Sequence, residues 1–223
     1  MSAAADFTEL AHRFAGSAFD GARLLDEVGR GRRSRVYRCI WKGRECALKV
    51  HARSATERHR RLTGQGIAEF EFGRNRAYYR APGMKHYVAE PLGFVSAGEL
   101  QALAQELLRG EIYYQYYRKR RGAVAASLAQ DLERMVELAH AAELFDMDLH
   151  SMNVMVVEER GALVPKLFDF NLIPFTVRPQ NFLVGWLLKA GLMSRRSRDQ
   201  RRLRRFHDFG PIERRLKRRV TES

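Results

Sequence analysis

Residues 144–156 read Leu-Phe-Asp-Met-Asp148-Leu-His-Ser-Met-Asn153-Val-Met-Val, and residues 166–171 read Lys-Leu-Phe-Asp169-Phe-Asn. An Asp and an Asn five residues apart in a loop, followed by a second Asp after a short strand pair, can supply one proton acceptor and two oxygen ligands. Phosphoryl transfer with Mg²⁺ requires such a set, because carboxylate or amide oxygens hold the metal together with the nucleotide phosphates. Asp and Asn are also common at ordinary turns. We favour the chemical interpretation because a glycine-rich turn and a strand lysine precede these residues, and their order and spacing agree with phosphoryl transfer.

A glycine-rich turn is the first of these motifs, in the stretch Gly29-Arg-Gly31-Arg-Arg-Ser34-Arg-Val36. Glycine allows a backbone to approach phosphate oxygens closely and to adopt positive φ, so the turn can close over a nucleotide. Most hairpins that carry two glycines are only turns, so the motif has little weight alone. In the phosphoryl-transfer interpretation, Gly29, Gly31, Ser34 and Val36 contact the nucleotide.

The second motif is a lysine on the third expected strand, in Ala47-Leu-Lys49-Val. A two-residue turn at Lys42-Gly43 would set a register in which Ala47 and Lys49 share one sheet face with Val36. Lys49 would then lie over the glycine-rich turn, with Ala47 beside it at the nucleotide. An edge-strand lysine that keeps its amine in water is the alternative.

A carboxylate on the next helix, predicted over residues 66–80, can orient Lys49 toward nucleotide phosphates. Glu71 is the favoured partner because it lies on the apolar stripe that should face inward, with Ile67 and Tyr78. Glu69 is the alternative partner.

The remaining pattern places a sheet-rich first half before a helical second half. An amphipathic lead-in helix begins behind Asp6, and three strands are expected between residues 22 and 50. Later elements are strands near 87–95 and 100–107, a helix over 128–140, and short strands at 153–157 and 163–168. In the expected hairpin, Cys39 and Cys46 face each other as reduced, half-buried side chains, with a minor redox role as the alternative.

Composition and charge restrict the class of protein. The chain has 223 residues, 45% of them hydrophobic, and its 40 Lys and Arg against 26 Asp and Glu give a net charge of +14. This apolar content suffices for a packed core and argues against intrinsic disorder. The longest apolar run, residues 182–188, is too short to span a membrane and is typical of a core helix. The acidic start lacks a signal-peptide pattern, so we expect a cytoplasmic protein, and two cysteines are too few for a disulfide framework or a zinc site.

As a set, the motifs resemble the protein-kinase-like fold over roughly residues 22–175. The family pattern has a glycine-rich loop, an Ala-x-Lys strand, a helix Glu, an Asp-Leu-x-x-x-x-Asn catalytic loop and an Asp-Phe-Gly-type metal site. The resemblance implies an α+β, two-lobed fold, with a small antiparallel-sheet N-lobe and an abbreviated helical C-lobe, that binds ATP and Mg²⁺. The implied roles are catalytic for Asp148 and Lys49, nucleotide-binding for Lys49 together with Glu71, which orients it, and metal-binding for Asn153 and Asp169.

A narrower similarity points to small bacterial lipopolysaccharide-core kinases and the YrbL-like PhoP-regulatory-network family. It rests on the stretch Phe168-Asp-Phe-Asn-Leu-Ile-Pro174 and on the Arg198-Asp199 region. His150, which stands where protein kinases usually have Lys, makes the catalytic loop more similar to that of small-molecule and sugar kinases. This similarity implies phosphate transfer to a sugar hydroxyl of a lipopolysaccharide core or a similar glycolipid. The first rival is a non-catalytic kinase-like regulator, and the second, less favoured, is a basic nucleic-acid-binding protein.

Three departures from the family pattern limit what the resemblance implies. The usual His and Arg of the catalytic motif are Asp146 and Met147, so control through a phosphorylated loop is not expected. The metal-site Gly is Asn171, a residue that tolerates left-handed backbone angles. Because only about fifty residues follow Asn171, we expect the usual peptide-substrate platform to be largely missing.

The expected division is a lead-in helix at 1–20, an N-lobe at 21–108, a C-lobe at 109–193 and a basic tail at 194–223. Twelve Lys and Arg lie between residues 195 and 219. A solvated helix face is the default interpretation of such a run. The functional interpretation is contact with an anionic acceptor, or with an anionic membrane at the inner face of the inner membrane. Nucleic acid is less favoured because the tail has few aromatic side chains, and the oligomeric state is left open.

Overall fold

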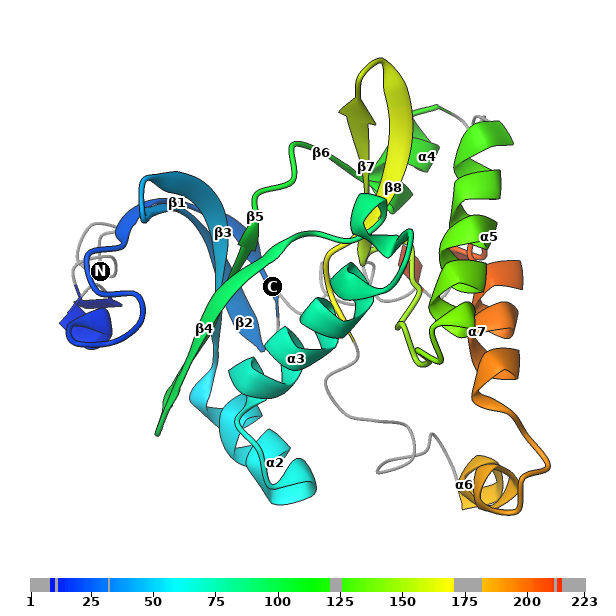
Figure 1. The fold of residues 1–223 in the computed structure, drawn as a ribbon, viewed down its shortest axis with the longest axis horizontal. Helices are drawn as coiled ribbons and strands as arrows, with labels where there is room; N and C mark the ends of the chain where they lie inside the picture. Colours follow the sequence, from blue (N-terminus) through cyan, green and yellow to red (C-terminus); the bar gives the residue numbers. More distant parts are fainter. Residues whose placement is uncertain are drawn as a thin grey trace.

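The computed structural model describes residues 9–10, 12–31, 33–120, 126–170, 182–210 and 212–213. These residues form an N-terminal part built on a five-stranded sheet, and a C-terminal part built on helices and a three-stranded sheet (Figure 1). Three features of the sequence analysis lie outside the described residues: the start of the lead-in at residues 1–8, Asn171, and residues 214–223 of the expected tail.

The N-terminal sheet is antiparallel throughout, with strand order β1-β2-β3-β5-β4. Its strands are β1 Arg23–Arg30, β2 Ser34–Trp41, β3 Arg44–His51, β4 Pro91–Ala97 and β5 Leu100–Glu106. Lys42 and Gly43 connect β2 to β3 with φ of 51° and 73°, the left-handed angles of a two-residue hairpin turn. This turn sets the predicted register, in which Val36 lies opposite Lys49.

The two faces of this sheet are covered differently. Helix α3, Ile67–Arg80, packs against β4 and β5 on the face that carries Lys49. The segment before β1 covers part of the opposite face, where Phe14, Phe19 and Trp41 pack edge to face in series. Each large apolar side chain buried in that core contributes roughly 1.5–3 kcal/mol. One face therefore supplies stability, and the other remains for polar groups.

The two cysteines belong to the apolar face. Cys39 and Cys46 are direct partners in the β2–β3 register, as predicted, and their Sγ atoms are 3.2 Å apart. Both are free thiols, and they are fully buried rather than half-buried.

Two elements of the N-terminal part differ from the sequence expectation. Helix α2, Arg53–Thr63, is not expected from the sequence. Only three of its residues are buried, so the sequence shows no clear apolar stripe there. Strand β4 begins at Pro91 rather than near Tyr87, since a 3₁₀ turn, η1 Met84–His86, precedes it.

The C-terminal part combines a small antiparallel sheet, with strand order β6-β7-β8, and several helices. Its elements are β6 Gly110–Ile112, α4 Tyr113–Lys119, α5 Ala126–Ala141, β7 Val154–Glu159, β8 Ala162–Leu167, α6 Phe182–Lys189 and α7 Arg195–Arg204. The helical spacing predicted for α5 is confirmed, because Leu128, Leu132, Met135 and Val136 are all buried in the core of this part.

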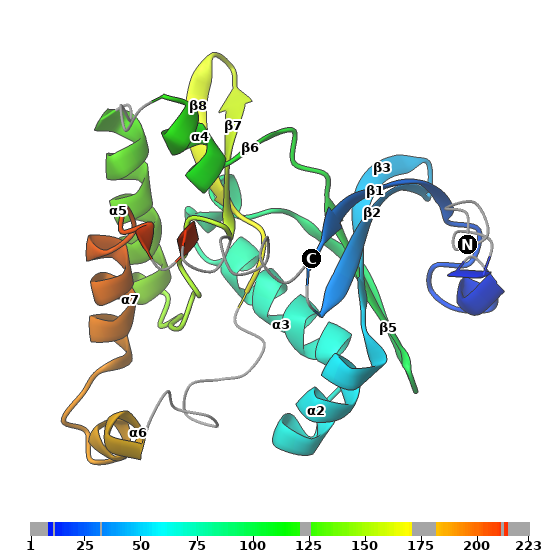
Figure 2. The same cartoon turned by 180° about the vertical axis from the view of Figure 1, so that it is seen from behind.

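Helix α7 occupies the first part of the segment expected to be a basic tail. It packs against α5, as Figure 2 shows from behind. Asp199 is fully buried, and Phe206 joins the C-terminal core just after the helix. Residues 195–206 are therefore part of the folded domain, although several of their arginines remain exposed to solvent.

Helix α6 differs from α7 because it exposes its apolar side chains. Phe182 is 87% exposed and Trp186 is 53% exposed, with Leu183 between them and Leu192 beyond the helix also accessible. This exposure contradicts the core helix expected at residues 182–188. Within the described ranges, no helix combines the length and the apolar character needed to cross a bilayer.

Candidate active site

Lys49 lies at the centre of the candidate site. Its side chain is buried, and Ala47, two residues earlier on β3, is buried on the same strand face. Lys49 Nζ is 2.6 Å from Glu71 Oε1 and 2.8 Å from Asp169 Oδ1. Glu71 is buried on α3, whereas Glu69 is exposed, so the apolar stripe identifies the residue that contacts the lysine. The structure thus joins predicted residues from the sheet, from α3 and from the segment after β8.

The loop between α5 and β7, here called the catalytic loop (residues 144–153), holds Asp148 and Asn153. Asn153 Nδ2 donates to the Asp148 carbonyl oxygen at 3.0 Å and to its Oδ2 at 3.3 Å. The Asn153 carbonyl accepts from the backbone N–H of Phe168 at 3.1 Å, which connects this loop to the segment that carries Asp169.

The backbone of the catalytic loop is strained at two positions. Asp146 and Asp148 adopt positive φ, 61° and 57°. Such a conformation costs a non-glycine residue on the order of 1–3 kcal/mol and persists only where surrounding contacts hold it. The loop therefore needs support from outside its own sequence.

Helix α7 provides that support. Asp199 accepts hydrogen bonds from the backbone N–H groups of Asp146 and of the next residue, at 3.0 and 3.3 Å. Arg198 Nη1 is 2.7 Å from Asp146 Oδ1, and Arg202 Nη1 pairs with Asp148 Oδ1. The basic helix thus holds both strained residues.

Helix α3 supports the same loop from the opposite side. Tyr78 donates its hydroxyl to the Phe145 carbonyl at 2.8 Å, and Arg74 Nη2 donates to the carbonyls of Phe145 and Asp146 at 2.8 and 2.9 Å. Phe170, next to Asp169, stacks on Tyr78 with ring centroids 5.3 Å apart. One helix therefore contacts the lysine, the catalytic loop and the segment after β8.

The glycine-rich turn lies between β1 and β2, as predicted. Gly31 N–H donates to the Ser34 carbonyl at 2.8 Å, and Val36 follows on the face of Lys49. Neither Gly29 nor Gly31 has positive φ, so the turn does not use the left-handed angles that glycine allows. A Cβ at either position would meet its nearest neighbour at 3.5 Å, an ordinary contact, so packing within the chain does not require glycine there.

Comparisons with known proteins bear on this arrangement. No protein-family model matches the chain. A probable LIM domain-containing serine/threonine-protein kinase of Dictyostelium discoideum is 24% identical over 151 residues, which cover 65% of this chain and 14% of that protein. The crystal structure of Rad53 in complex with AMP-PNP aligns with a TM-score of 0.56 at 14% identity, over 74% of this chain and 43% of that chain. The chain has a protein-kinase-like fold.

The kinase-like fold is the α+β class that the motifs predicted, with an antiparallel sheet before a helical part. The chain matches less than half the length of either protein, so the likeness concerns the fold of the matched region and not the whole of those proteins.

The charges around Lys49 in this kinase-like fold are unequal. Burial lowers the pKa of Lys49, but Asp169 and Glu71 outweigh burial and raise it above its usual value. For Glu71, burial raises the pKa, whereas Lys49 and then His51, with Nε2 3.1 Å from Glu71 Oε2, lower it to about 2. The pKa of Asp169 is raised, because burial outweighs the effect of Lys49 and Glu71 adds repulsion. One ammonium group serves two carboxylates, so a further cation at Asp169 would be favoured.

The donor chemistry fits Mg²⁺ at this place. The Asp169 side chain is 38% exposed, so a metal ion can reach it. The side-chain amide nitrogen of Asn153 faces Asp148, which leaves the side-chain oxygen Oδ1 of Asn153 as a ligand. No group of three His, Cys, Asp or Glu in the described part of the chain is placed to hold a metal. A hard cation here would take its remaining ligands from nucleotide phosphates and water, as Mg²⁺ does in nucleotide sites.

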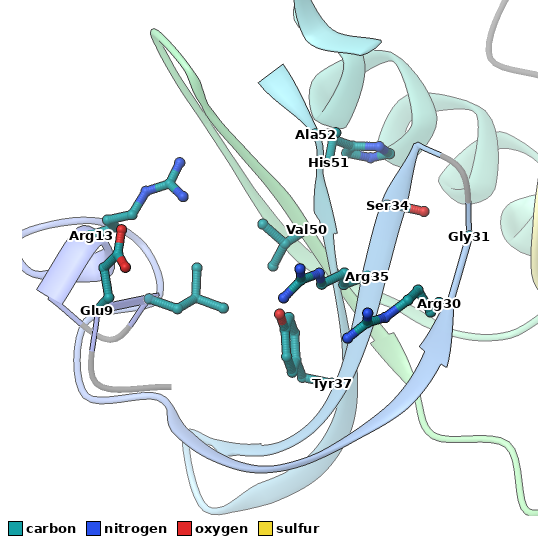
Figure 3. A pocket seen from close by; sticks show the side chains of 11 residues that line it. Glu9, Arg13, Arg30, Gly31, Ser34, Arg35, Tyr37, Val50, His51 and Ala52 are labelled. Carbon is teal, nitrogen blue, oxygen red and sulfur yellow. The ribbon is translucent and has the colours of Figure 1, made fainter. Parts of the chain in front are cut away.

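A cavity of about 460 Å³ lies beside β2 and β3, mainly on the other face of the N-terminal sheet. Figure 3 shows the side chains that line it. Arg35, Tyr37 and Val50 line it from β2 and β3, and Arg13 faces them from the segment before β1. Arg35 and Val50 are direct partners one residue away from the Val36–Lys49 pair, so they point away from Lys49. Gly31, Ser34 and His51 also line the cavity, so it borders the glycine-rich turn of the candidate active site.

Sequence reasoning assigned no role to three residues that support the site. His51 lies two residues after Lys49 on β3, so the period of two already places both side chains on the same face. Asp199 is the single acid within residues 194–207, and an isolated acid in a basic helix is a signal of an internal partner. Arg202 has no local signal that separates it from its neighbours.

Proposed function

We propose that the chain is an ATP·Mg²⁺-dependent phosphotransferase that transfers a phosphoryl group to a hydroxyl. The main support is the double contact of Lys49 Nζ with Glu71 and Asp169, next to a loop that presents Asp148 and Asn153. The kinase-like fold, and the AMP-PNP held by its Rad53 neighbour, support a nucleotide as the ligand.

ATP·Mg²⁺ would supply the transferable phosphoryl group and neutralise the charge that develops on it. Lys49, oriented by Glu71, would bind the phosphates, and Asp169 and Asn153 would hold the metal. Asp148 would orient the acceptor hydroxyl and accept its proton.

The N-terminal sheet would supply the rest of the nucleotide site. The turn from Gly29 through Gly31 to Ser34 would cover the phosphates. Val36 and Ala47, which share the Lys49 face, would lie against the nucleotide.

Calorimetry with ATP, with and without Mg²⁺, tests the nucleotide and the metal. Wild-type binding should tighten when Mg²⁺ is present, and Asp169→Ala should remove this effect while the fold persists. Glu158→Ala changes an exposed acid in the same part of the protein and should keep it. Wild-type protein that shows no Mg²⁺-dependent ATP binding would contradict the proposal.

Turnover is tested separately with Asp148→Asn. This variant should keep ATP binding and lose ATP hydrolysis, because only the proton acceptor changes. Equal hydrolysis by the variant and the wild type would instead favour a non-catalytic kinase-like regulator.

The acceptor we propose is a sugar hydroxyl of a lipopolysaccharide core or a similar anionic glycolipid. Its support is the sequence similarity at residues 168–174 and the positive charge of the chain, which attracts anionic acceptors. Transfer of labelled γ-phosphate to purified core oligosaccharide, absent with Asp148→Asn, is the expected result. Label that appears on protein acceptors and not on the oligosaccharide would refute this choice.

We also propose peripheral contact with an anionic membrane at α6 and the start of α7. The exposed side chains that support it are apolar along α6 and cationic at the end of α6 and the start of α7: Phe182, Leu183, Trp186, Lys189, Arg195 and Arg196. Short helices with exposed aromatic residues and neighbouring cations bind in the plane of anionic bilayers.

Point substitutions test this contact better than a deletion of residues 195–223. The deletion would also remove Asp199 and Arg202, which contact the catalytic loop. Leu183→Glu should abolish salt-sensitive co-sedimentation with phosphatidylglycerol vesicles. Leu62→Glu, at an exposed leucine on α2, should not. Equal vesicle binding by both variants would contradict the contact.

A further inference from the structure

The catalytic loop contains no permanent cation of its own. Residues 144–157 include neither Lys nor Arg. His150 is tied within the loop, since its Nδ1 accepts the backbone N–H of Met152 at 3.1 Å. A fixed positive charge beside Asp148 therefore has to come from another element.

Arg202 on α7 brings that charge to the loop. Its Nη1 pairs with Asp148 Oδ1, and its side chain is only 25% exposed. Arg198 lies one helical turn earlier and pairs with Asp146, while the buried Asp199 binds the loop backbone. These contacts fix the position of α7 against the loop, so Arg202 is held in place and is not a freely moving surface side chain.

The carboxylate of Asp148 is directed through both of its oxygens. Oδ1 faces Arg202, and Oδ2 accepts from Asn153 Nδ2 at 3.3 Å. Two donors on different oxygens restrict rotation of the carboxylate about its Cβ–Cγ bond. The side chain remains 31% exposed, so its remaining lone pairs can reach an acceptor hydroxyl.

We propose that Arg202 is a positioning residue for phosphoryl transfer, an inference that rests on the proposed function. It holds Asp148 in the orientation that accepts the proton of the acceptor, and it adds positive charge beside the group being transferred. Arginine suits this task because its guanidinium is always charged and its donors have a fixed geometry.

The experiment measures ATP·Mg²⁺ hydrolysis with water as the acceptor, in Arg202→Ala, Arg202→Lys and Arg204→Ala. Arg204 is exposed on the same helix, so its substitution removes one positive charge without touching the catalytic loop. Arg202→Ala should lower kcat by up to about 100-fold with little change in KM for ATP, because misplacing a reacting group affects the chemical step. Arg202→Lys should retain part of the activity, and added ethylguanidinium should partly restore Arg202→Ala. Circular dichroism and melting of each variant report whether the fold is intact.

The outcomes separate this inference from the proposed function. If Arg202→Ala and Arg204→Ala have the same kcat while Asp148→Asn is inactive, the role of Arg202 is refuted and the proposed function is not. An Arg202→Ala variant that is more active than wild type also refutes it, and means that the arginine blocks Asp148 until an acceptor displaces it. Hydrolysis that is the same in wild type and Asp148→Asn overturns the proposed function, and the role of Arg202 with it.

Discussion

Replacement of Glu71 by Gln tests the buried charge cluster. The folded protein lowers the pKa of Glu71 from its ordinary value of 4.5 to about 2, against the effect of burial, because Lys49 and His51 favour the ionised form. This difference corresponds to about 3 kcal/mol of stability from the ionised carboxylate. Glu71→Gln keeps the size of the side chain and an oxygen that can accept from Lys49, but it removes the charge. We therefore expect the free energy of unfolding at pH 7 to fall by up to about 3 kcal/mol.

The pH dependence gives this prediction a definite sign. Because the pKa is lower in the folded state, the unfolded chain takes up the proton first as the pH falls, and the stabilisation is lost between about pH 4.5 and pH 2. Urea titrations at pH 7, 5 and 3 should show a wild-type advantage that is full at the first two values and reduced at the third. Glu69→Gln, at an exposed position on the same helix, should match wild type throughout. Equal stability of wild type and Glu71→Gln at pH 7, or a difference that does not narrow at pH 3, would refute the reasoning.

Two other substitutions test how the C-terminal part is held. Asp199→Ala removes the acceptor of two backbone N–H groups, so the free energy of unfolding should fall by roughly 2–4 kcal/mol in urea titrations, and amide exchange at Asp146 and Met147 should accelerate. Unchanged exchange at both amides would contradict the support assigned to α7. Gly110→Ala would place a Cβ 2.1 Å from the Val156 carbonyl oxygen, so β6 must move away from β7 and thermal unfolding should show a loss of roughly 3 kcal/mol. A variant as stable as wild type would mean that this strand pairing contributes little.

Much of the nucleotide side of the site could be predicted from sequence, because short periods decide it. The two-residue turn at Lys42 fixes the β2–β3 register, and the period of two then places Lys49 on the face of Val36. The helical period distinguishes the buried Glu71 from the exposed Glu69. Each of these relations depends on residues that are close together in the chain or on one strand pair.

The support of the catalytic loop could not be predicted in this way. Arg198 and Arg202 resemble Arg201 and Arg204 in local sequence, and only the rotation of α7 toward a loop more than 50 residues earlier separates them. Treating the whole basic run as one surface therefore overestimated the charge available to an external partner. Residues 171–181 lie outside the described part of the chain. It therefore stays a prediction that Asn171 tolerates the backbone angles of the Gly that usually stands at this position in the family.

The position of α7 also has a consequence for synthesis on the ribosome. The N-terminal sheet is complete at Glu106 and the Lys49–Glu71 pair earlier still, but the acceptor for the Asp146 amide arrives 53 residues after that amide. A growing chain can therefore form the Lys49–Glu71 pair before it can fix the catalytic loop. A premature stop codon just upstream of residue 198 would make this condition permanent. The product would retain Lys49 and Glu71, but its two strained aspartates would have lost their contacts with α7.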